Sequence, residues 1–371
     1  MGIIGTVLAF VLVLVVLVLV HELGHFVVAK LAGITVQEFG IGFPPRIGSV
    51  VWRGTRYSVN WIPLGGFVKM LGEDGEIEAE KMRQRGLSET AVERAMEGAF
   101  NRKPIGLRII VLVAGVAMNF LLAVVLFAAA SSLPTPNRLG PLTVTAVQPG
   151  SPAAATLKVG DQITAADGNS YPLARDLTQY VTSRAGHDVR LTIKRAGHFV
   201  TVTVVPRVLT DAERQRGLGP VGFSWSAQPE PPIATGPIDA LAHGASISTQ
   251  IAVQIPAALG QTVMGLIGLA PNTGDARGPI GIAQATGEVL QEPLVFQLAF
   301  VGLLSVNLAV LNVLPFPPLD GGRVAVVIIE AVRRRRLPAE REALIYITGF
   351  LVLMALVILI SIQDIARLPG S

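Results

Sequence analysis

The sequence predicts a polytopic α-helical membrane protein with about four transmembrane helices, a membrane-associated β-hairpin and an inserted extracytoplasmic α/β domain. Of the 371 residues, 51% are hydrophobic and only 15% are charged, which is too apolar for a soluble protein. Each of four apolar runs reaches the length of about 20 residues that a membrane span needs, and they lie at 3–28, 105–130, 293–314 and 343–362. A polar region with strand-like runs separates the second run from the third.

The first apolar run ends in an ionisable motif, His21-Glu22-Leu23-Gly24-His25. Residues four apart share one face of a helix, so His21 and His25 can bind the same metal ion. Glu22 lies about 100° around the helix, where it can hold a water molecule beside the metal without being a ligand. The pattern His-Glu-x-x-His is typical of zinc metalloproteases, in which Glu is the general base. A chance match is the alternative, but ionisable residues inside a membrane span are costly and indicate function.

A third metal ligand is expected where the third apolar run ends, in the segment Asn312 to Gly322. Prolines at 315, 317 and 318 end the helix, and irregular backbone at membrane depth is tolerated where it lines a cavity or is buried in protein. The chain has no cysteine, so its metal ligands must be His and carboxylate. A carboxylate in this break is costly unless it binds a cation, which makes Asp320 the predicted third ligand.

Other roles for the carboxylates remain open. Asp320 could instead cap the helix that starts at Gly321. Glu288, Glu330 and Asp364 lie nearer the ends of spans and are poorer candidates. Two His and one carboxylate would leave the fourth zinc position open, which is typical of a catalytic site rather than a structural one.

Residues 50–59 are predicted to form two short strands around a turn at Gly54, followed by a loop that contains Gly65 and Gly66. The edge of such a hairpin could hold an extended substrate by strand addition, although a purely structural hairpin is equally compatible with the pattern. The charged segment from Glu73 to Asn101 is expected to be a solvated helical loop without a strong apolar face.

The second span carries Gly115-Val116-Ala117-Met118-Asn119, whose small residues favour close packing of helices. Asn119 is a polar side chain in an apolar helix and needs a partner, either on a neighbouring helix or in the backbone of a substrate. Packing alone is the alternative role for this segment.

The insert between the second and third spans is predicted to contain strands at 142–147, 161–165, 189–194 and 200–205 and a helix at 173–183. His187 and His198 lie in turns beside glycine and are expected to be solvated. Residues 217–237 are rich in Gly and Pro and are interpreted as a linker. Residues 238–270 could form a helix on the membrane surface, a gate or, less favourably, a further span, with His243 at the interface.

Charge placement predicts the orientation of the spans. The loops after the first and third spans are rich in Lys and Arg, including Arg333 to Arg336, and are therefore predicted to be cytoplasmic. The insert and both termini then lie outside the cytoplasm. A cleaved signal peptide is not predicted at the N-terminus, because the first residues carry no Lys or Arg and no small-residue cleavage site precedes His21.

With these motifs, the chain resembles the site-2 protease family in its bacterial form with a single PDZ domain. The matching stretches are the motif at 21–25, residues 115–119, and the segment from Asn312 through Pro315 to Leu319-Asp320-Gly321. The fourth is the insert with Gly150-Ser151-Pro152-Ala153 and Val159-Gly160-Asp161. The family usually has Pro where Val116 stands, and Ala-Gly-Leu where this chain has 155–157.

The resemblance implies a fold and an activity. His21, His25 and Asp320 would hold one Zn²⁺ per chain, Glu22 would be the base, and Asn312 would contribute to catalysis by stabilising the oxyanion. Asn119, Gly65 and Gly66 would contact substrate. The substrate class would be a single-pass membrane protein already trimmed by another protease, such as an anti-sigma factor, or a signal-peptide remnant.

The expected organisation has four parts. An N-terminal membrane part covers 1–131, a PDZ-like domain 138–208, a linker and interfacial segment 209–290, and a C-terminal membrane part 291–371. The chain is predicted to lie in the bacterial cytoplasmic membrane, in contact with lipid and not with nucleic acid. Two other functions remain open: an inactive homologue that escorts membrane proteins, and a metal transporter, although the internal repeats of a transporter are missing.

Overall fold

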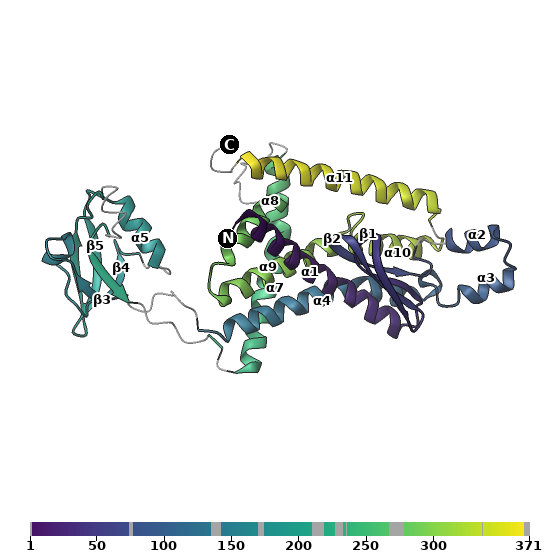
Figure 1. The fold of residues 1–371 in the computed structure, drawn as a ribbon, viewed down its shortest axis with the longest axis horizontal. Helices are drawn as coiled ribbons and strands as arrows, with labels where there is room; N and C mark the ends of the chain where they lie inside the picture. The colour runs from purple at the N-terminus through teal and green to yellow at the C-terminus, as the bar shows by residue number, and fades with distance from the viewer. Residues whose placement is uncertain are drawn as a thin grey trace. The chain divides into compact units, whose positions relative to one another are not determined.

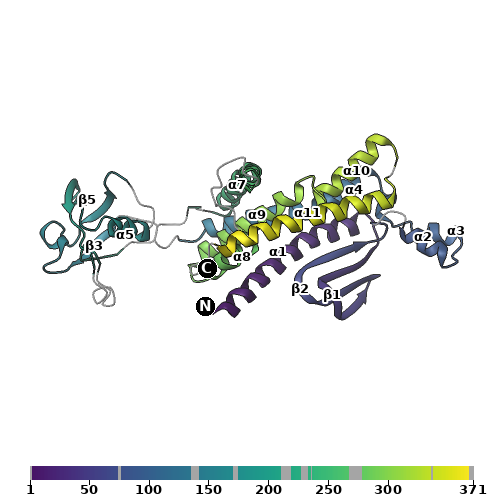
Figure 2. The ribbon, with the colours of Figure 1, turned by 90° about the horizontal axis from the view of Figure 1, so that it is seen from above.

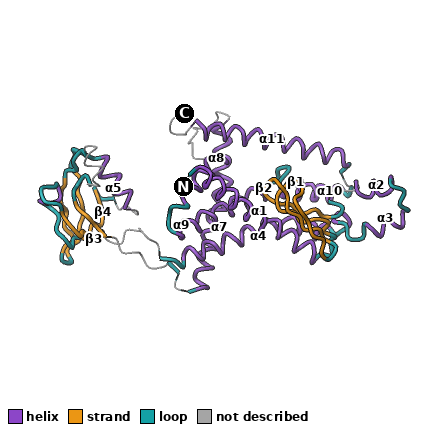
Figure 3. Tube along the Cα trace, in the orientation of Figure 1, coloured by secondary structure: helices purple, strands orange, loops and turns teal. Residues whose placement is uncertain are grey.

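A computed structural model of the protein describes residues 2–73, 77–134, 142–169, 174–209, 219–226, 233–234, 236–266, 278–335 and 337–366. The chain forms two compact units, which are described separately. Unit 1 consists of residues 1–130 and 236–371, and unit 2 of residues 131–235. Unit 1 contains the first sheet and most of the helices, and unit 2 contains the second sheet with a helix beside it (Figure 3).

Four helices of unit 1 correspond to the predicted spans: α1 (Ile3–Leu31), α4 (Ile105–Ser131), α9 (Leu294–Val313) and α11 (Ala339–Ala366). All four are long and apolar enough to cross a membrane. They alternate in direction, so that the start of α1 and the end of α11 lie at one end of unit 1, and the starts of α4 and α11 lie at the other (Figures 1 and 2). Among the described residues, four helices suited to span a membrane therefore lie where the four spans were predicted.

Three further helices of unit 1 follow unit 2 in the sequence. Helix α7 (Pro237–Leu266) continues through Pro256, packs against α9 and is not among the candidate spans of the described residues. Helix α8 (Pro279–Val289) contacts both α1 and α11. The carboxylate of Asp364 accepts hydrogen bonds from the backbone N–H groups of Gly278 and Gly281 at 3.1 and 2.8 Å, which satisfies the N-terminus of α8. Helix α10 (Asp320–Arg333) follows the break after α9.

The first sheet is larger than the predicted hairpin. Strands β1 (Val36–Trp52) and β2 (Thr55–Met70) are joined by a turn at Arg53-Gly54, as expected. Each strand bends back along itself, so residues 38–41 pair on one side with 56–59, and residues 36–41 pair on the other side with 66–70. The predicted loop around Gly65 and Gly66 is therefore wrong, because Gly66 to Met70 form an edge of this sheet.

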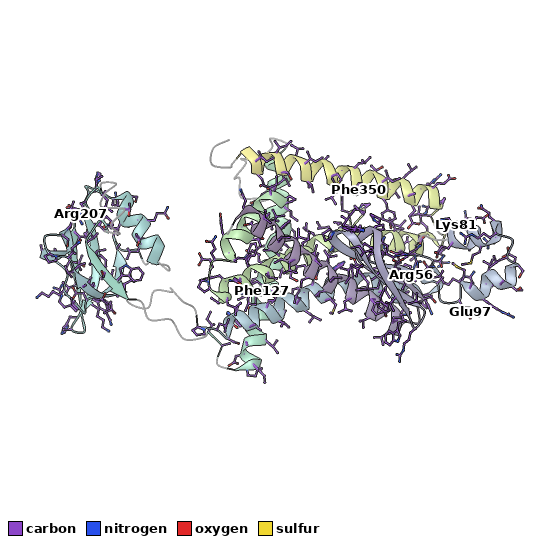
Figure 4. All side chains as sticks on the ribbon, in the orientation of Figure 1. Arg56, Lys81, Glu97, Phe127, Arg207 and Phe350 are labelled. Carbon is purple, nitrogen blue, oxygen red and sulfur yellow. The ribbon has the colours of Figure 1, made fainter. Side chains whose placement is uncertain are left out.

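The segment after β2 forms α2 (Ile77–Gln84), α3 (Glu89–Ala95) and the short 3₁₀ helix Phe100–Arg102. The sequence predicted no strong apolar face in this segment, and that prediction is wrong. Five buried residues form a small core of their own: Leu71, Ala79, Val92, Met96 and Ala99. Charged residues of this segment are exposed, as Lys81 on α2 and Glu97 in the turn after α3 illustrate (Figure 4).

Unit 2 is a five-stranded antiparallel sheet with one described helix, α5 (Ala174–Ser183). The order is β6 (His198–Val204), β5 (Val189–Arg195), β4 (Gln162–Ala166), β3 (Leu142–Val147) and β7 (Phe223–Ser226). Its core includes Val144, Val189 and Ile193, each fully buried, because alternate residues of each strand face inward. His187 and His198 are exposed, as predicted.

Strand β7 corrects the predicted linker at 217–237. Residues 223–226 pair with β3, so the sheet extends beyond the predicted domain boundary at residue 208. A cavity of about 100 Å³ lies between this strand and α5 and is lined on the helix by Leu177 and Val181. Two residues of the predicted linker, Val221 and Phe223, also line it.

Candidate metal centre

Three side chains from distant parts of the chain converge inside unit 1. Nε2 of His21 lies 2.8 Å from Oδ2 of Asp320, Nε2 of His25 lies 3.2 Å from the same oxygen, and the two nitrogens are 3.2 Å apart. Both His residues are 6% exposed. Ligand atoms of a tetrahedral zinc ion with bonds of about 2.0–2.1 Å are separated by roughly 3.3 Å, so this triangle has nearly the right size.

Hydrogen bonding fixes the ring of His25 in a state that suits a metal. Its Nδ1 lies 2.8 Å from the carbonyl oxygen of Val111, which can only accept, so Nδ1 carries the hydrogen and donates it. Nε2 of the neutral ring then has a free lone pair that faces His21 and Asp320. The carbonyl of Val111 was not expected from the sequence, because a backbone acceptor leaves no signal in residue type.

His21 is oriented by Asn119. The Asn119 side-chain amide lies 3.2 Å from Nδ1 of His21, and Asn119 is fully buried. As oriented, the amide nitrogen faces His21 and Oδ1 has no hydrogen-bond partner. Turning the amide by 180° gives Oδ1 a partner, because Nδ1–H of His21 then donates to it. Hydrogen-bonded neighbours of this kind orient metal-bound histidines.

With these tautomers the centre contains two nitrogen lone pairs and a carboxylate oxygen that face one another. Three acceptors within 3.2 Å repel each other unless a cation lies between them. His and carboxylate donors in a set of three are the ligands of catalytic zinc. The residues therefore fit a zinc ion, with one coordination position left for water.

Glycines allow α1 and α4 to approach closely at the centre. A Cβ on Gly24 would overlap the carbonyl oxygen of Ala114, and a Cβ on Gly115 would overlap Nε2 of His25. Tertiary packing thus requires Gly at both positions. The sequence predicted close packing near Gly115, but its role in making room for the His rings appears only in the structure.

Asp320 reaches the centre because the chain turns sharply between α9 and α10. The N-cap residue of α10 is Leu319, and no side-chain cap is present, so the alternative of a capping role for Asp320 is wrong. Gly321 packs against the end of α9, where a Cβ would overlap the carbonyl oxygens of Val313 and Leu314. This contact fixes the first turn of α10 against the end of α9.

The other carboxylates lie elsewhere, as expected. Glu330 forms an ion pair of 3.2 Å with Arg108. Asp364 binds the N-terminus of α8, and Glu288 is exposed. In the part of the chain that the structure describes, the group of His21, His25 and Asp320 is the one cluster of three with metal-binding geometry.

A cavity of about 380 Å³ opens onto the centre. Its lining includes all three metal-centre residues together with Glu22, Asn312 and Gly66. Gly66 lies close to Glu22, since a Cβ at position 66 would be 3.7 Å from Cγ of Glu22. Glu22 and Asn312 are therefore brought to the same cavity from α1 and α9, as predicted.

Two predicted site residues do not line this cavity. Asn119 is buried behind His21, and Gly65 packs toward α1, where a Cβ would lie 3.3 Å from Cγ1 of Val18. Gly65 has a φ of +125°, which favours glycine. Its position next to α1 brings the following strand, residues 66–70, alongside the helix that carries the His pair.

Two charged residues of the cavity wall were missed from the sequence. Glu73 and Arg323 form an ion pair at the edge of the cavity. The attraction of Glu73 raises the pKa of Arg323 above its usual value, so the guanidinium stays charged. The two residues are 250 positions apart in the sequence, so no local pattern indicates that they pair.

Comparison with known proteins agrees with this geometry. The sequence pattern of Peptidase family M50 matches residues 9–356. The chain belongs to peptidase family M50. It is a zinc metalloendopeptidase of the site-2 protease type, and the expected family, activity and cofactor are confirmed.

Relatives match along almost the whole chain. A Clostridium perfringens protein, provisionally named a zinc metalloprotease, is 35% identical over 350 residues, which cover 94% of this chain and 95% of that protein. The regulator of sigma-W protease RasP of Bacillus subtilis is 29% identical and covers 98% of this chain and 99% of its own length. The PDZ domain of an SdrC-like protein of Listeria monocytogenes covers 24% of this chain and 88% of its own, at 22% identity and a TM-score of 0.21.

Proposed function

We propose that the protein hydrolyses a peptide bond in or near the transmembrane segment of a single-pass membrane protein that another protease has already trimmed. The observation that carries the proposal is the shared cavity: the metal-centre residues, Glu22 and the sheet-edge residues Gly66, Phe67 and Val68 all line it. A substrate strand lying along this edge would therefore pass the metal.

The sheet edge supports binding of the substrate in an extended form. Residues 66–70 pair with β1 on one side, and no other described strand pairs with them on the opposite side. A free edge offers backbone N–H and C=O groups to an added strand. A helical substrate must unwind to be cut, because its amides are hydrogen-bonded and shielded, and strand addition compensates for the hydrogen bonds lost.

We assign His21, His25 and Asp320 as the zinc ligands. When bound, zinc would supply Lewis-acid activation of the attacking water and of the scissile carbonyl. Glu22 would take the proton from the water and pass it to the leaving amine. Asn312, which also lines the cavity, would donate a hydrogen bond to the developing oxyanion.

Asn119 has a better-supported role in positioning His21 than in contacting substrate. It is fully buried and hydrogen-bonded to His21, and Oγ of Ser305 donates to its backbone carbonyl at 2.7 Å. Gly65 and Gly66 would act through the path of the backbone, by bringing the edge strand close to α1. The alternative, a purely structural hairpin that packs under the site, would not use the free edge of residues 66–70.

The orientation follows from charge. The end of unit 1 that carries the sheet, α2 and α3 is rich in Lys and Arg, and we infer that it faces the cytoplasm. Unit 2 and both termini would then be extracytoplasmic, in the bacterial cytoplasmic membrane. Unit 2 would act as a reader of the trimmed substrate tail, using the cavity between α5 and β7. The name of the Bacillus subtilis relative favours a membrane-bound regulator of a sigma factor as substrate.

The test uses the full-length protein in liposomes with a tagged single-pass protein, supplied either with its extracytoplasmic domain or with that domain removed. The wild-type protein is expected to cut only the trimmed form, within or beside its membrane span. Glu22→Gln is expected to lose about 10²–10⁴-fold in kcat while one zinc per chain remains bound. Cleavage by Glu22→Gln at the wild-type rate would refute the assigned mechanism, and transport of zinc without cleavage would favour a transporter.

A further inference from the structure

The ion pair between Glu73 and Arg323 connects the helix that carries Asp320 to the sheet edge beside the metal centre. Arg323 lies three residues after Asp320, so both project from the same side of the first turns of α10. Residues 66–70 at the end of β2 form the edge of the sheet, and Glu73 lies three residues after Met70, where the strand ends. One ion pair thus joins the helix of the third metal ligand to the strand that borders the metal.

Glu73 makes two contacts with its two oxygens. Oε2 accepts a hydrogen bond from the backbone N–H of Met70 at 3.2 Å, and Oε1 accepts one from the guanidinium of Arg323. A carboxylate can hold both donors at once, because each oxygen is an acceptor. The side chain of Glu73 is 15% exposed, so water screens these contacts only in part.

The pair also forms a wall between two cavities. Both residues line the cavity of the metal centre, and both line a second cavity of about 150 Å³ between α4, α10 and α11. The backbone around Glu73 is held from the other side as well, since Leu71 exchanges hydrogen bonds with Thr35 and Phe100 at 2.9 and 2.7 Å. The end of the edge strand is therefore anchored at the boundary between the two cavities.

We propose that Glu73 and Arg323 are positioning residues that set the register of a bound substrate strand relative to the metal, and so select which peptide bond is cut. This inference rests on the proposed function. The edge strand would bind the substrate backbone, and the ion pair would fix the distance between that backbone and Asp320. If the substrate strand shifted by one residue along the edge, a different peptide bond would lie at the metal. Each substrate side chain would then point to the opposite face of the sheet.

The variant Glu73→Gln tests the role, because one of the two acceptor oxygens is replaced by an NH2 group, which would face either the Met70 N–H or the Arg323 guanidinium. We expect the variant to bind one zinc per chain, to lose about ten- to a hundredfold in kcat, and to cut the trimmed substrate at one or more additional bonds. Mass spectrometry of the products identifies the bonds. A merely structural role would lower the amount of active protein without moving the cleavage position.

Arg108 and Glu330 provide a matched control on the same helix. Their ion pair is partly buried, and Glu330 lies two turns after Arg323 on α10. Arg108 lines the second cavity, and neither Arg108 nor Glu330 lines the cavity of the metal centre. Glu330→Gln is expected to keep the wild-type cleavage position and to stay within about twofold of the wild-type kcat.

A double-mutant cycle shows whether Glu73 and Arg323 act through their contact with each other or independently. The double variant Glu73→Gln, Arg323→Gln is expected to be no slower than the worse single variant, because each change breaks the same contact. Arg323→Lys retains the charge and is expected to be less impaired than Arg323→Gln. Additive losses in the cycle would overturn the proposal.

A measurement that needs no cleavage tests the coupling between Glu73 and Arg323 even if the chosen substrate is not cut. Hydrogen exchange of the zinc-free protein is expected to speed up about tenfold or more at residues 66–70 and 320–323 in Glu73→Gln, with no change there in Glu330→Gln. If the wild-type protein does not cut the substrate, the proposed function fails while this measurement still tests the coupling. Unchanged exchange at both segments, or unchanged cleavage position in active Glu73→Gln, would refute the positioning role.

Discussion

Gly115 lies directly against the ring of His25. A Cβ at position 115 would overlap Nε2 of His25 and would lie 2.8 Å from Cε1 of His21. Helix α4 therefore holds the His pair at a distance that only glycine permits, and the metal centre depends on the packing of two helices as well as on its ligands.

The variant Gly115→Ala is expected to lower zinc affinity by at least about tenfold, because the His rings must shift to admit the methyl group, which disturbs their geometry with Asp320. Titration of the zinc-free protein with zinc measures the effect. Gly106→Ala is the matched control in the same helix, since a Cβ there meets nothing within 4 Å. Equal zinc affinity in the two variants would contradict the described packing.

Asn119 is expected to act on the metal through His21. Asn119→Leu should weaken zinc binding by about 10–100-fold, because His21 loses the acceptor that fixes its ring. Asn119→Asp keeps an acceptor oxygen for Nδ1–H and should bind zinc more tightly than Asn119→Leu. A rise in KM at unchanged zinc affinity in Asn119→Leu would instead indicate the substrate contact that the sequence suggested.

Unit 2 is expected to lose stability in acid through one ion pair. Both carboxylate oxygens of Asp161 accept hydrogen bonds from Arg195, at 2.7 and 2.6 Å, and this pairing with Arg195 lowers the pKa of Asp161 below its ordinary value. A carboxyl group whose pKa is lowered on folding stabilises the fold above its unfolded pKa of about 3.9. That stabilisation is lost as the pH falls through the lower folded value.

Hydrogen exchange of β4 and β5 in the full-length protein measures this loss, after correction for the intrinsic effect of pH on exchange. Wild-type protection should fall below about pH 4, whereas Asp161→Asn should be less protected at pH 6 and depend less on pH. Asp188→Asn, which changes an exposed carboxylate, is the control and should follow the wild type. The same pH dependence in all three proteins would contradict the assignment.

Much of the fold follows from local patterns in the sequence. The four spans are recognisable because apolar residues continue for a full membrane thickness. His21 and His25 share a helix, so their spacing already places them together. Asp320 could be predicted because the prolines and glycines around it mark a broken helix, in which a carboxylate needs a partner.

Other features depend on contacts that no local pattern reveals. The folding back of β1 and β2 makes Gly66 to Met70 a sheet edge, although Pro63, Gly65 and Gly66 resemble a loop in the sequence. Strand β7 is only four residues long and lies within a segment rich in Gly and Pro. The ion pair of Glu73 and Arg323 forms only because the tertiary fold brings the two charges together.

The most direct test of the account is the zinc content of the purified full-length protein and of Asp320→Ala, measured by mass spectrometry. The account predicts about one zinc per chain in the wild type, lost or sharply weakened in Asp320→Ala and retained in the control Glu330→Gln. Zinc that persists at one per chain in Asp320→Ala would contradict the assignment of the third ligand, and with it the site built between α1 and α10.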